Sequence, residues 1–284
     1  MKIGIVGLGL IGGSMAKAIK RKTDHQVLGL DTNEETMQLA LLSGSIDEKL
    51  TGENLSSCSL VMIAIAPQAL LNWVQEHAAD FGKDAVLVDL CGVKRMMSEH
   101  LQPIAKANGF KYIGGHPMAG KEVAGFQNAV PDLYTGASMI LCPEKDTDIV
   151  MLDRLKAFFL SLGFGSVVFS TPEEHDAIIS YTSQLAHVVS SAYIKSPTSR
   201  KRMGFTAGSY KDMTRVARLN PDLWTELFLA DADNLGKELD FLIQNLTACK
   251  DAIQSGDAAA LRSLLAEGNK LKQTEPYEDH KGNS

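Results

Sequence analysis

The stretch GGHPMAG, residues 114–120, places His116 directly before a proline and among three glycines. A proline disfavours the helical conformation in the residue before it, so we expect His116 to be extended. Glycine and proline together favour a constrained backbone path. A histidine held in this way can act as a general base, because its pKa lies near neutral pH. A tight turn in which the histidine only caps a neighbour is the alternative interpretation.

The stretch GSYKDMTR, residues 208–215, carries the second candidate group. Lys211 and Arg215 are four residues apart, so on a helix they share a face, with Asp212 nearby. Two cations beside glycine-containing backbone suit an anionic substrate, and the planar guanidinium of Arg215 can bind a carboxylate through two hydrogen bonds. A solvated basic helix end explains the same spacing.

Two further histidines could take part in chemistry. His187 lies in an apolar helical stretch, SQLAHVVSSAYI, where a histidine packed in the core is the ordinary explanation. His175 lies beside acidic residues near a predicted helix start, and we interpret it as structural. The four cysteines are scattered without a CxxC pair, so we expect neither a metal site nor a disulfide framework.

A glycine fingerprint follows the first predicted strand. Residues 2–6 form a short apolar run, GLGLIG follows at once, and residues 14–22 have helical composition. In a dinucleotide-binding fold such glycines permit the turn, the approach of a pyrophosphate and close packing of the helix, whose N-terminus attracts phosphate. A chance glycine-rich turn is the alternative. The candidate cofactor-binding residues here are Gly7, Leu8, Gly9, Leu10, Ile11 and Gly12.

An acidic residue ends the second predicted strand, residues 26–30. Asp31 comes nineteen residues after Gly12, where a dinucleotide-binding fold places the acid that binds the adenosine ribose hydroxyls. A carboxylate there would repel a 2′-phosphate, and no arginine follows it immediately, so we expect NAD rather than NADP. Asp31 could instead cap the helix that starts near Asn33, or do both.

Strands and helices alternate through residue 170. The predicted strands after the first two are residues 60–65, 85–89, 112–113, 138–142 and 166–169. This alternation predicts an α/β fold, a Rossmann-like and mostly parallel sheet covered on both faces. Ligands bind at the carboxyl ends of such strands. The residues that fall at these ends are Asp31, Ala66 and Pro67 (further cofactor candidates), residues 89–94, and His116.

The pattern changes at about residue 171. Thr171 and the following proline and glutamates predict a capped helix start, and from there the sequence predicts helices only. Apolar residues at three-four spacing predict one long helix over residues 223–253, followed by a helix at about 257–272 and a frayed tail. We therefore expect a Rossmann-like domain, residues 1–170, and an all-α dimerisation domain, residues 171–284. Its apolar stripe favours a homodimer, with an intramolecular bundle as the alternative.

Composition limits the possible partners. A net charge of −6 argues against nucleic acid or an anionic membrane as the main partner. No apolar run approaches the roughly 18 residues that span a bilayer. The N-terminal apolar run is broken by glycines and lacks a cleavage-site pattern, so we do not expect a signal peptide. We expect a cytoplasmic protein.

With these features in place, the sequence resembles the prephenate/arogenate dehydrogenase family of tyrosine biosynthesis. The similarity runs in collinear order through GLGLIGGS, LCGVK, GGHPMAGKEVAG, TPEEHD and GSYKDMTRVARLNPDLW, and it covers nearly the whole chain. The resemblance implies an NAD-binding domain, a helical dimerisation domain and an active site between them. It also implies NAD-dependent oxidative decarboxylation of prephenate to 4-hydroxyphenylpyruvate, or of arogenate to tyrosine.

The resemblance also implies roles for individual residues. His116 would accept the proton of the ring 4-hydroxyl while hydride leaves that carbon for the nicotinamide, after which carbon dioxide departs. Arg215 matches the arginine that binds a substrate carboxylate, and His187 matches a histidine of the substrate pocket. The other substrate-site candidates are Glu122, which follows the HPMAG loop, Gly208, and Lys211, which with Asp212 matches positions near the subunit interface.

Three positions depart from the family pattern. Many relatives have a serine at Gly92 whose hydroxyl helps to hold the catalytic histidine, so water or another donor must serve here. Gln184 stands where many relatives have a histidine, and Lys121 where others have a threonine. Positive character at His187 and Lys121 favours prephenate, which lacks the ammonium group of arogenate. We expect neither a regulatory ACT domain nor a fused chorismate mutase.

Two other interpretations remain open from the sequence. A dehydrogenase of the β-hydroxyacid or pyrroline-carboxylate type would share the layout but would lack the HPMAG histidine. A non-catalytic NAD-sensing module would keep the glycine fingerprint and Asp31, but would have no reason to keep His116 and Arg215 together.

Overall fold

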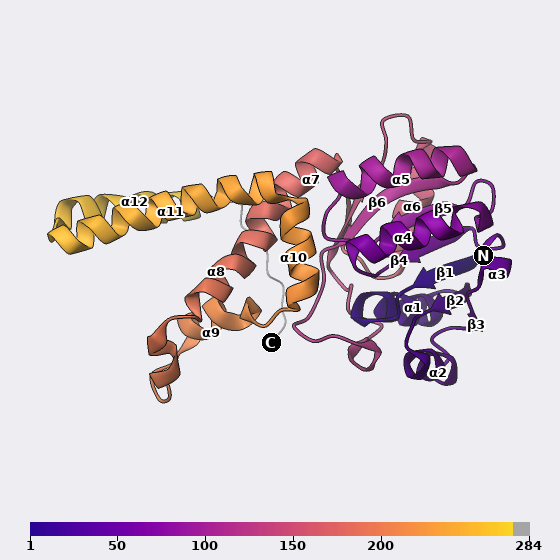
Figure 1. The fold of residues 1–284 in the computed structure, drawn as a ribbon, viewed down its shortest axis with the longest axis horizontal. Helices are drawn as coiled ribbons and strands as arrows, with labels where there is room; N and C mark the ends of the chain where they lie inside the picture. The colour runs from indigo at the N-terminus through magenta and orange to yellow at the C-terminus, as the bar shows by residue number, and fades with distance from the viewer. Residues whose placement is uncertain (275–284) are drawn as a thin grey trace. The chain divides into compact units, whose positions relative to one another are not determined.

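The computed structural model describes residues 1–274, so His280 and most of the predicted tail lie outside the described residues. The chain divides into two compact units (Figure 1). The first runs from Met1 to Leu235 and the second begins at Gly236. The first unit contains the sheet and every candidate site residue named above.

An eight-stranded sheet forms the centre of the first unit, in the order β3-β2-β1-β4-β5-β6-β7-β8. All neighbouring strands are parallel except β6 and β7, which confirms the predicted mostly parallel sheet. The strands are β1 (Lys2–Val6), β2 (Gln26–Leu30), β3 (Glu48–Lys49), β4 (Leu60–Ile63), β5 (Val86–Asp89), β6 (Lys111–Pro117), β7 (Ser138–Cys142) and β8 (Ser166–Phe169).

Four of these strands, β1, β2, β7 and β8, have the bounds that the sequence predicts. Strand β3 was not predicted, because its two residues, Glu48 and Lys49, are charged and exposed and give no apolar signal. Strand β6 is longer than expected, since it continues through the motif to Pro117. His116 therefore lies on a strand, in the extended conformation that its following proline predicts.

Strand register brings the predicted ligand-binding positions to one edge of the sheet. Leu30 pairs with Val6, Val6 with Ile63, Ile63 with Asp89, and Asp89 with Gly114. These five residues form a row near the carboxyl ends of five parallel strands. The loops that follow them open at the same edge, which is where doubly wound sheets bind ligands.

Helices cover both faces of the sheet because each central strand is apolar on both sides. In β4, for example, Leu60 and Met62 pack into one apolar cluster while Val61 and Ile63 pack into the other. The first cluster is completed by α1 (Leu10–Lys22), α2 (Glu34–Leu42) and α6 (Ile149–Ser161). The second is completed by α3 (Gly52–Leu55), α4 (Pro67–His77) and α5 (Arg95–Asn108). Figure 1 shows α4 and α5 side by side.

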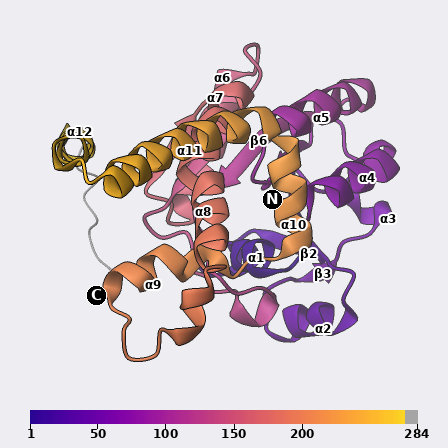
Figure 2. The same ribbon diagram turned by 60° about the vertical axis from the view of Figure 1, so that its left-hand side comes forward.

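After β8 the described residues are almost wholly helical, which confirms the predicted change of pattern. Thr171 caps the first of these helices by accepting a hydrogen bond from the backbone N–H of Glu174, at 3.2 Å. The helices are α7 (Pro172–Ile179), a π-helical stretch (Ser180–Leu185), α8 (Ala186–Tyr193), α9 (Gly208–Thr214), α10 (Pro221–Ala230), α11 (Ala232–Ser255) and α12 (Ala258–Thr274). Helices α8 and α9 are in contact (Figure 2).

The single long helix predicted over residues 223–253 is wrong, because the chain breaks at Asp231 into α10 and α11. The Asp231 carboxylate is fully buried and accepts hydrogen bonds from Arg95 at 2.7 Å, Gln184 at 3.2 Å and Asn234 at 2.8 Å. These contacts stabilise the interruption between α10 and α11, while the apolar spacing in the sequence continues through it. The sequence pattern therefore gave no sign that the helix ends at Asp231.

The second unit consists of the greater part of α11 together with α12, close to the predicted bounds of the last helix. Large apolar side chains on these helices are exposed, and they include Phe241, Ile243, Leu246, Ile253, Leu265 and Leu271. Within residues 1–274, no helix combines the length and the apolar character needed to cross a membrane.

Candidate active site

His116 lies on β6 between two hydrogen-bonded neighbours, β5 and β7. The two preceding glycines provide space rather than a turn. A Cβ atom on Gly115 would lie 2.6 Å from Val88 Cγ1 and 2.7 Å from the backbone oxygen of Asp89. A Cβ atom on Gly114 would lie 2.9 Å from Cδ of Lys94. The glycines thus let β6 pack closely against β5 and the Lys94 side chain, and they hold the His116 backbone in an interior strand.

A chain of hydrogen bonds joins His116 to an acid on α7. His116 Nδ1 lies 2.9 Å from His175 Nε2, and His175 Nδ1 lies 2.7 Å from Asp176 Oδ1. Both partners are buried, His175 with 2% and Asp176 with 0% of its surface exposed. The sequence did not predict this contact, since we interpreted His175 as structural.

Asp176 also stabilises the start of α5. Its two carboxylate oxygens accept the backbone N–H groups of Lys94 at 2.7 Å and Arg95 at 2.9 Å. Burial alone would raise the pKa of Asp176, but the hydrogen bonds from His175 and these two N–H groups outweigh it, so the pKa is lowered. The carboxylate is therefore ionised at neutral pH.

A second buried cluster contains Lys94, whose backbone N–H donates to Asp176. The Lys94 ammonium pairs with the carboxylate of Asp89, and neither side chain has exposed surface. Asp89 also accepts hydrogen bonds from the Tyr112 hydroxyl at 2.7 Å and from the backbone N–H of Cys91 at 2.9 Å. The Asp89 carboxylate therefore accepts two hydrogen bonds in addition to its ion pair, as a buried carboxylate requires.

Burial lowers the pKa of His116 well below its usual value of 6.5, and repulsion from Lys94, and from His175 whenever that ring is protonated, lowers it further. Burial also lowers the pKa of His175, despite the opposing hydrogen bond to Asp176. Both imidazoles are therefore neutral at neutral pH. Within residues 1–274, His116 Nε2 has no hydrogen-bond partner, and it is not sealed from solvent. His116 is thus in the neutral form that can accept a proton, and one of its ring nitrogens has no partner among those residues.

The glycine fingerprint forms a cradle at the end of β1. Gly7 has a φ of +84°, and a Cβ atom on Gly12 would lie 1.8 Å from the backbone oxygen of Gly7. A Cβ atom on Gly9 would meet nothing within 4 Å. Gly9 is also the N-cap of α1 and provides no side-chain cap, so the first N–H groups of α1 remain available. Space and free N–H groups together suit a pyrophosphate.

Asp31 lies beside this cradle. Its carboxylate accepts hydrogen bonds from the backbone N–H groups of Leu8 at 2.8 Å and Asn33 at 2.9 Å. The side-chain cap of α2 is Asn33, which accepts from the backbone N–H of Thr36 at 2.9 Å. Asp31 thus ties the glycine loop to the end of β2.

The remaining cofactor candidates lie where the sequence places them. Leu10 and Ile11 begin α1, Ala66 is the N-cap of α4, and Pro67 is its first residue. All are on loops or helix starts at the carboxyl ends of β1 and β4, the two strands where the strand order reverses.

His187 lies on α8 and is half-buried. Its Nδ1 lies 3.1 Å from the carbonyl oxygen of Val216, and its ring centroid lies 3.7 Å from that of Trp224. Burial lowers its pKa, the hydrogen bond to Val216 opposes this, and the charge of Arg215 adds to the lowering. His187 is therefore neutral at neutral pH, and Nδ1 donates its proton to the carbonyl.

The basic candidates lie on exposed segments. Helix α9 ends at Thr214, so Arg215 begins a short 3₁₀ turn rather than sharing a helix with Lys211. Arg215 forms an ion pair with Glu122, with 66% and 37% of the two side chains exposed. Lys211 is exposed on α9, and no hydrogen bond or ion pair joins it to Arg215 among the described residues. Gly208 opens α9.

The three departures from the family pattern also have positions in the structure. A Cβ atom on Gly92 would lie 3.3 Å from Leu227 Cδ2, so a leucine packs where a side chain would begin. Gln184 is buried in the π-helical stretch and donates a hydrogen bond to Asp231. Lys121 is exposed on the loop after β6.

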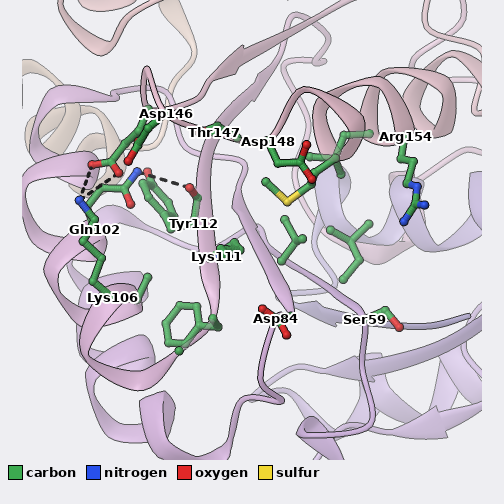
Figure 3. A pocket seen from close by; sticks show the side chains of 18 of the residues that line it. Ser59, Asp84, Gln102, Lys106, Lys111, Tyr112, Asp146, Thr147, Asp148 and Arg154 are labelled. Carbon is green, nitrogen blue, oxygen red and sulfur yellow. Dashed lines mark hydrogen bonds and ion pairs between the residues drawn. The ribbon is translucent and has the colours of Figure 1, made fainter.

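A separate groove lies at the opposite edge of the sheet. It has a volume of about 680 Å³ and includes residues at the amino ends of β4, β5 and β6, with Asp84, Gln102 and Lys111 in its wall (Figure 3). No candidate site residue from the sequence lines it. Doubly wound sheets bind ligands at the other edge, so this groove is not the candidate active site.

A doubly wound sheet with a glycine-rich turn that suits a pyrophosphate at its carboxyl edge is typical of nucleotide-binding enzymes, dehydrogenases among them. Two family models match the chain. "Prephenate dehydrogenase, nucleotide-binding domain" matches residues 15–168, and "Prephenate dehydrogenase, dimerization domain" matches residues 171–267. The chain belongs to the prephenate dehydrogenase family, a family of oxidoreductases.

Individual relatives agree with this assignment. A prephenate dehydrogenase of Bacillus subtilis is 27% identical over 90% of this chain and 71% of its own length. The structure of Aquifex aeolicus prephenate dehydrogenase with hydroxyphenyl propionate and NAD⁺ is 27% identical, has a TM-score of 0.80, and covers 96% of this chain and 97% of its own. Synechocystis arogenate dehydrogenase is similar at 27% identity and a TM-score of 0.80, covering 96% of this chain and 99% of its own. The relatives therefore include enzymes named for each of the two substrates.

Proposed function

We propose that this protein catalyses the NAD-dependent oxidative decarboxylation of prephenate to 4-hydroxyphenylpyruvate. The observation that carries the proposal is His116, a neutral imidazole with a free Nε2, at the sheet edge that also holds the glycine cradle. In the reaction His116 accepts the proton of the ring 4-hydroxyl at Nε2. The ring carboxylate leaves as carbon dioxide, and aromatisation makes the step effectively irreversible.

The chain's residues fit NAD as the cofactor. The turn at Gly7, the open space over Gly9 and the free start of α1 suit the pyrophosphate. In this proposal the Asp31 carboxylate, beside that turn, binds the adenosine ribose and repels a 2′-phosphate. Ala66 and Pro67 begin α4 after β4, the strand next to β1. When bound, NAD supplies the acceptor for the hydride from the ring carbon.

Arg215 binds a substrate carboxylate in this proposal. Its present partner is the Glu122 carboxylate, which the substrate carboxylate would replace or share. His187 contributes Nε2 as a hydrogen-bond acceptor, because Nδ1 already donates to Val216. Gly208 and Lys211 open and extend α9 beside these residues and complete the proposed substrate site.

Arogenate is the second candidate substrate, and His187 favours it. The sequence favoured prephenate because of positive character at His187 and Lys121. The lowered pKa of His187 removes that charge, and its Nε2 as an acceptor suits an ammonium donor. Of the two residues, only Lys121 still provides the positive charge that favours prephenate.

The test is the absorbance of NADH formed by the purified protein with each substrate in turn. We expect reduction of NAD with prephenate, with a smaller kcat/KM for arogenate. The variant His116→Asn should lose about 10²-fold or more in kcat and still bind NAD. No NADH with either substrate refutes the function, and near-normal turnover in the variant refutes the role of His116.

We also propose that residues 1–170 and 171–284 are the cofactor and dimerisation domains, and that the protein is a cytoplasmic homodimer without nucleic-acid or membrane partners. The match to a dimerization-domain model and the exposed apolar side chains of α11 and α12 support the dimer. All four cysteines are free thiols, as is usual in a reducing compartment. Sedimentation of the purified chain should give twice its mass of 30.7 kDa.

A further inference from the structure

We propose that His175 and Asp176 are positioning residues that keep the proton of His116 on Nδ1 and leave the lone pair of Nε2 free for the substrate. The inference rests on the proposed function, since it specifies how the proposed base is held. His175 provides a partner for His116 Nδ1 in a chain that has a glycine, Gly92, where many relatives have a serine.

The argument starts at Asp176, where the direction of the hydrogen bonds is fixed. Oδ1 and Oδ2 accept the backbone N–H groups of Lys94 and Arg95, which cannot act as acceptors. The carboxylate is ionised and has no proton to give. His175 Nδ1, at 2.7 Å from Oδ1, must therefore be the donor.

The direction of the bond between His175 and His116 follows from this. Because His175 is neutral and its proton is on Nδ1, its Nε2 is bare and can only accept. His116 Nδ1, 2.9 Å away, must donate to it. A neutral imidazole has one N–H, so the second nitrogen of His116, Nε2, is bare. The opposite order would set the bare His175 Nδ1 against an ionised carboxylate.

The same chain supports the charge that forms during the reaction. When His116 gains a proton at Nε2, its Nδ1–H still donates to His175, and the Asp176 carboxylate lies one ring further on. The Lys94 ammonium opposes this charge, and it is itself paired with Asp89. Cys142 on the neighbouring strand adds no charge, because burial raises the pKa of its thiol to about 12. The acid at the end of the relay thus offsets the nearby cation.

A purely structural role for His175 is the competing explanation, in which it only ties α7 to the sheet. Two variants separate the explanations. His175→Phe keeps the bulk and removes the acceptor, whereas His175→Gln keeps an amide oxygen that can accept from His116 Nδ1. We expect His175→Phe to lower kcat by about 10²-fold, with little change in the KM for the substrate or for NAD. His175→Gln should have a kcat between those of His175→Phe and the wild-type protein. His100→Phe, on the exposed side of α5, is the matched control and should not change kcat.

The decisive measurement needs no turnover, and a variant serves only to assign the signal of His116. In ¹⁵N-histidine-labelled protein with NAD, two-bond ¹H–¹⁵N spectra at neutral pH report which ring nitrogen of each histidine carries the proton; loss of a signal in His116→Asn assigns His116. We expect a protonated Nδ1 and a bare Nε2. A proton on Nε2 in the wild-type protein, or unchanged kcat in His175→Phe, overturns the inference. An inactive wild-type protein would instead overturn the proposed function, and the spectra would still report the tautomer.

Discussion

Replacing Lys94 with methionine should destabilise the protein strongly. The substitution keeps an unbranched side chain of similar length but removes the ammonium that pairs with Asp89, and both side chains are fully buried. Removing one partner of a buried ion pair costs about 3–5 kcal/mol, because an unpaired charge stays in the interior. Asp89 retains two donors, Tyr112 and Cys91. The expected loss is therefore near the lower end, about 3 kcal/mol.

The assay is urea denaturation followed by circular dichroism. The matched control is Lys106→Met, which breaks an ion pair with Glu144 whose side chains are 66% and 34% exposed. Exposed pairs contribute at most about 1 kcal/mol, so the control midpoint should hardly move. Adding Asp89→Asn to Lys94→Met should recover part of the lost stability, since a neutral amide no longer needs the cation.

The same substitution has a catalytic consequence with a defined sign. Lys94 is one of the groups that lower the pKa of His116, so its removal should raise that pKa towards 6.5. A higher pKa means that His116 is protonated, and inactive as a base, at a higher pH. The acid limb of kcat/KM should therefore move to higher pH in Lys94→Met. A loss of stability below about 1 kcal/mol, or an acid limb that moves to lower pH, would refute the reasoning.

Four further substitutions test the cofactor cradle and the substrate arginine. Gly12→Ala should lower the urea midpoint, because its Cβ would lie 1.8 Å from a backbone oxygen. Gly9→Ala should fold normally and weaken only NAD binding, since its Cβ would meet nothing within 4 Å. Equal urea midpoints for the two variants would contradict this expectation. Asp31→Ser should raise the affinity for NADP relative to NAD in fluorescence titrations, and an unchanged ratio would limit Asp31 to holding the loop. Arg215→Lys should raise KM for the substrate about tenfold without changing KM for NAD, because it loses the planar two-pronged donor, and an unchanged substrate KM would place the carboxylate elsewhere.

The sequence predicted the sheet well because its signal is local. Buried parallel strands such as β1 and β2 are short apolar runs bounded by glycine or acidic residues. The bounds of β1, β2, β7 and β8 match the prediction. The break at Asp231 could not be predicted, because it depends on contacts with Arg95 and Gln184, distant along the chain. Apolar spacing does not record such contacts.

The candidate site divides in the same way. His116 and the glycine cradle stand out because proline and glycine are recognisable wherever they occur. The partner of His116 does not, since His175 is 59 residues away and its neighbouring acids give it the pattern of a helix start. The TPEEHD stretch held the only local signal, an acid directly after the histidine. Similarly, Asp89 and Lys94 are charged residues whose burial no composition would predict.

The position of His116 on an interior strand has an evolutionary consequence. Hydrogen bonds from β5 and β7 fix that strand on both sides, whereas Arg215 and Glu122 project from exposed segments outside the sheet. Substitutions in those segments leave the strand pairing untouched. A lineage with this architecture can therefore exchange one substrate for a closely related one through peripheral changes, while the proton acceptor is inherited unaltered.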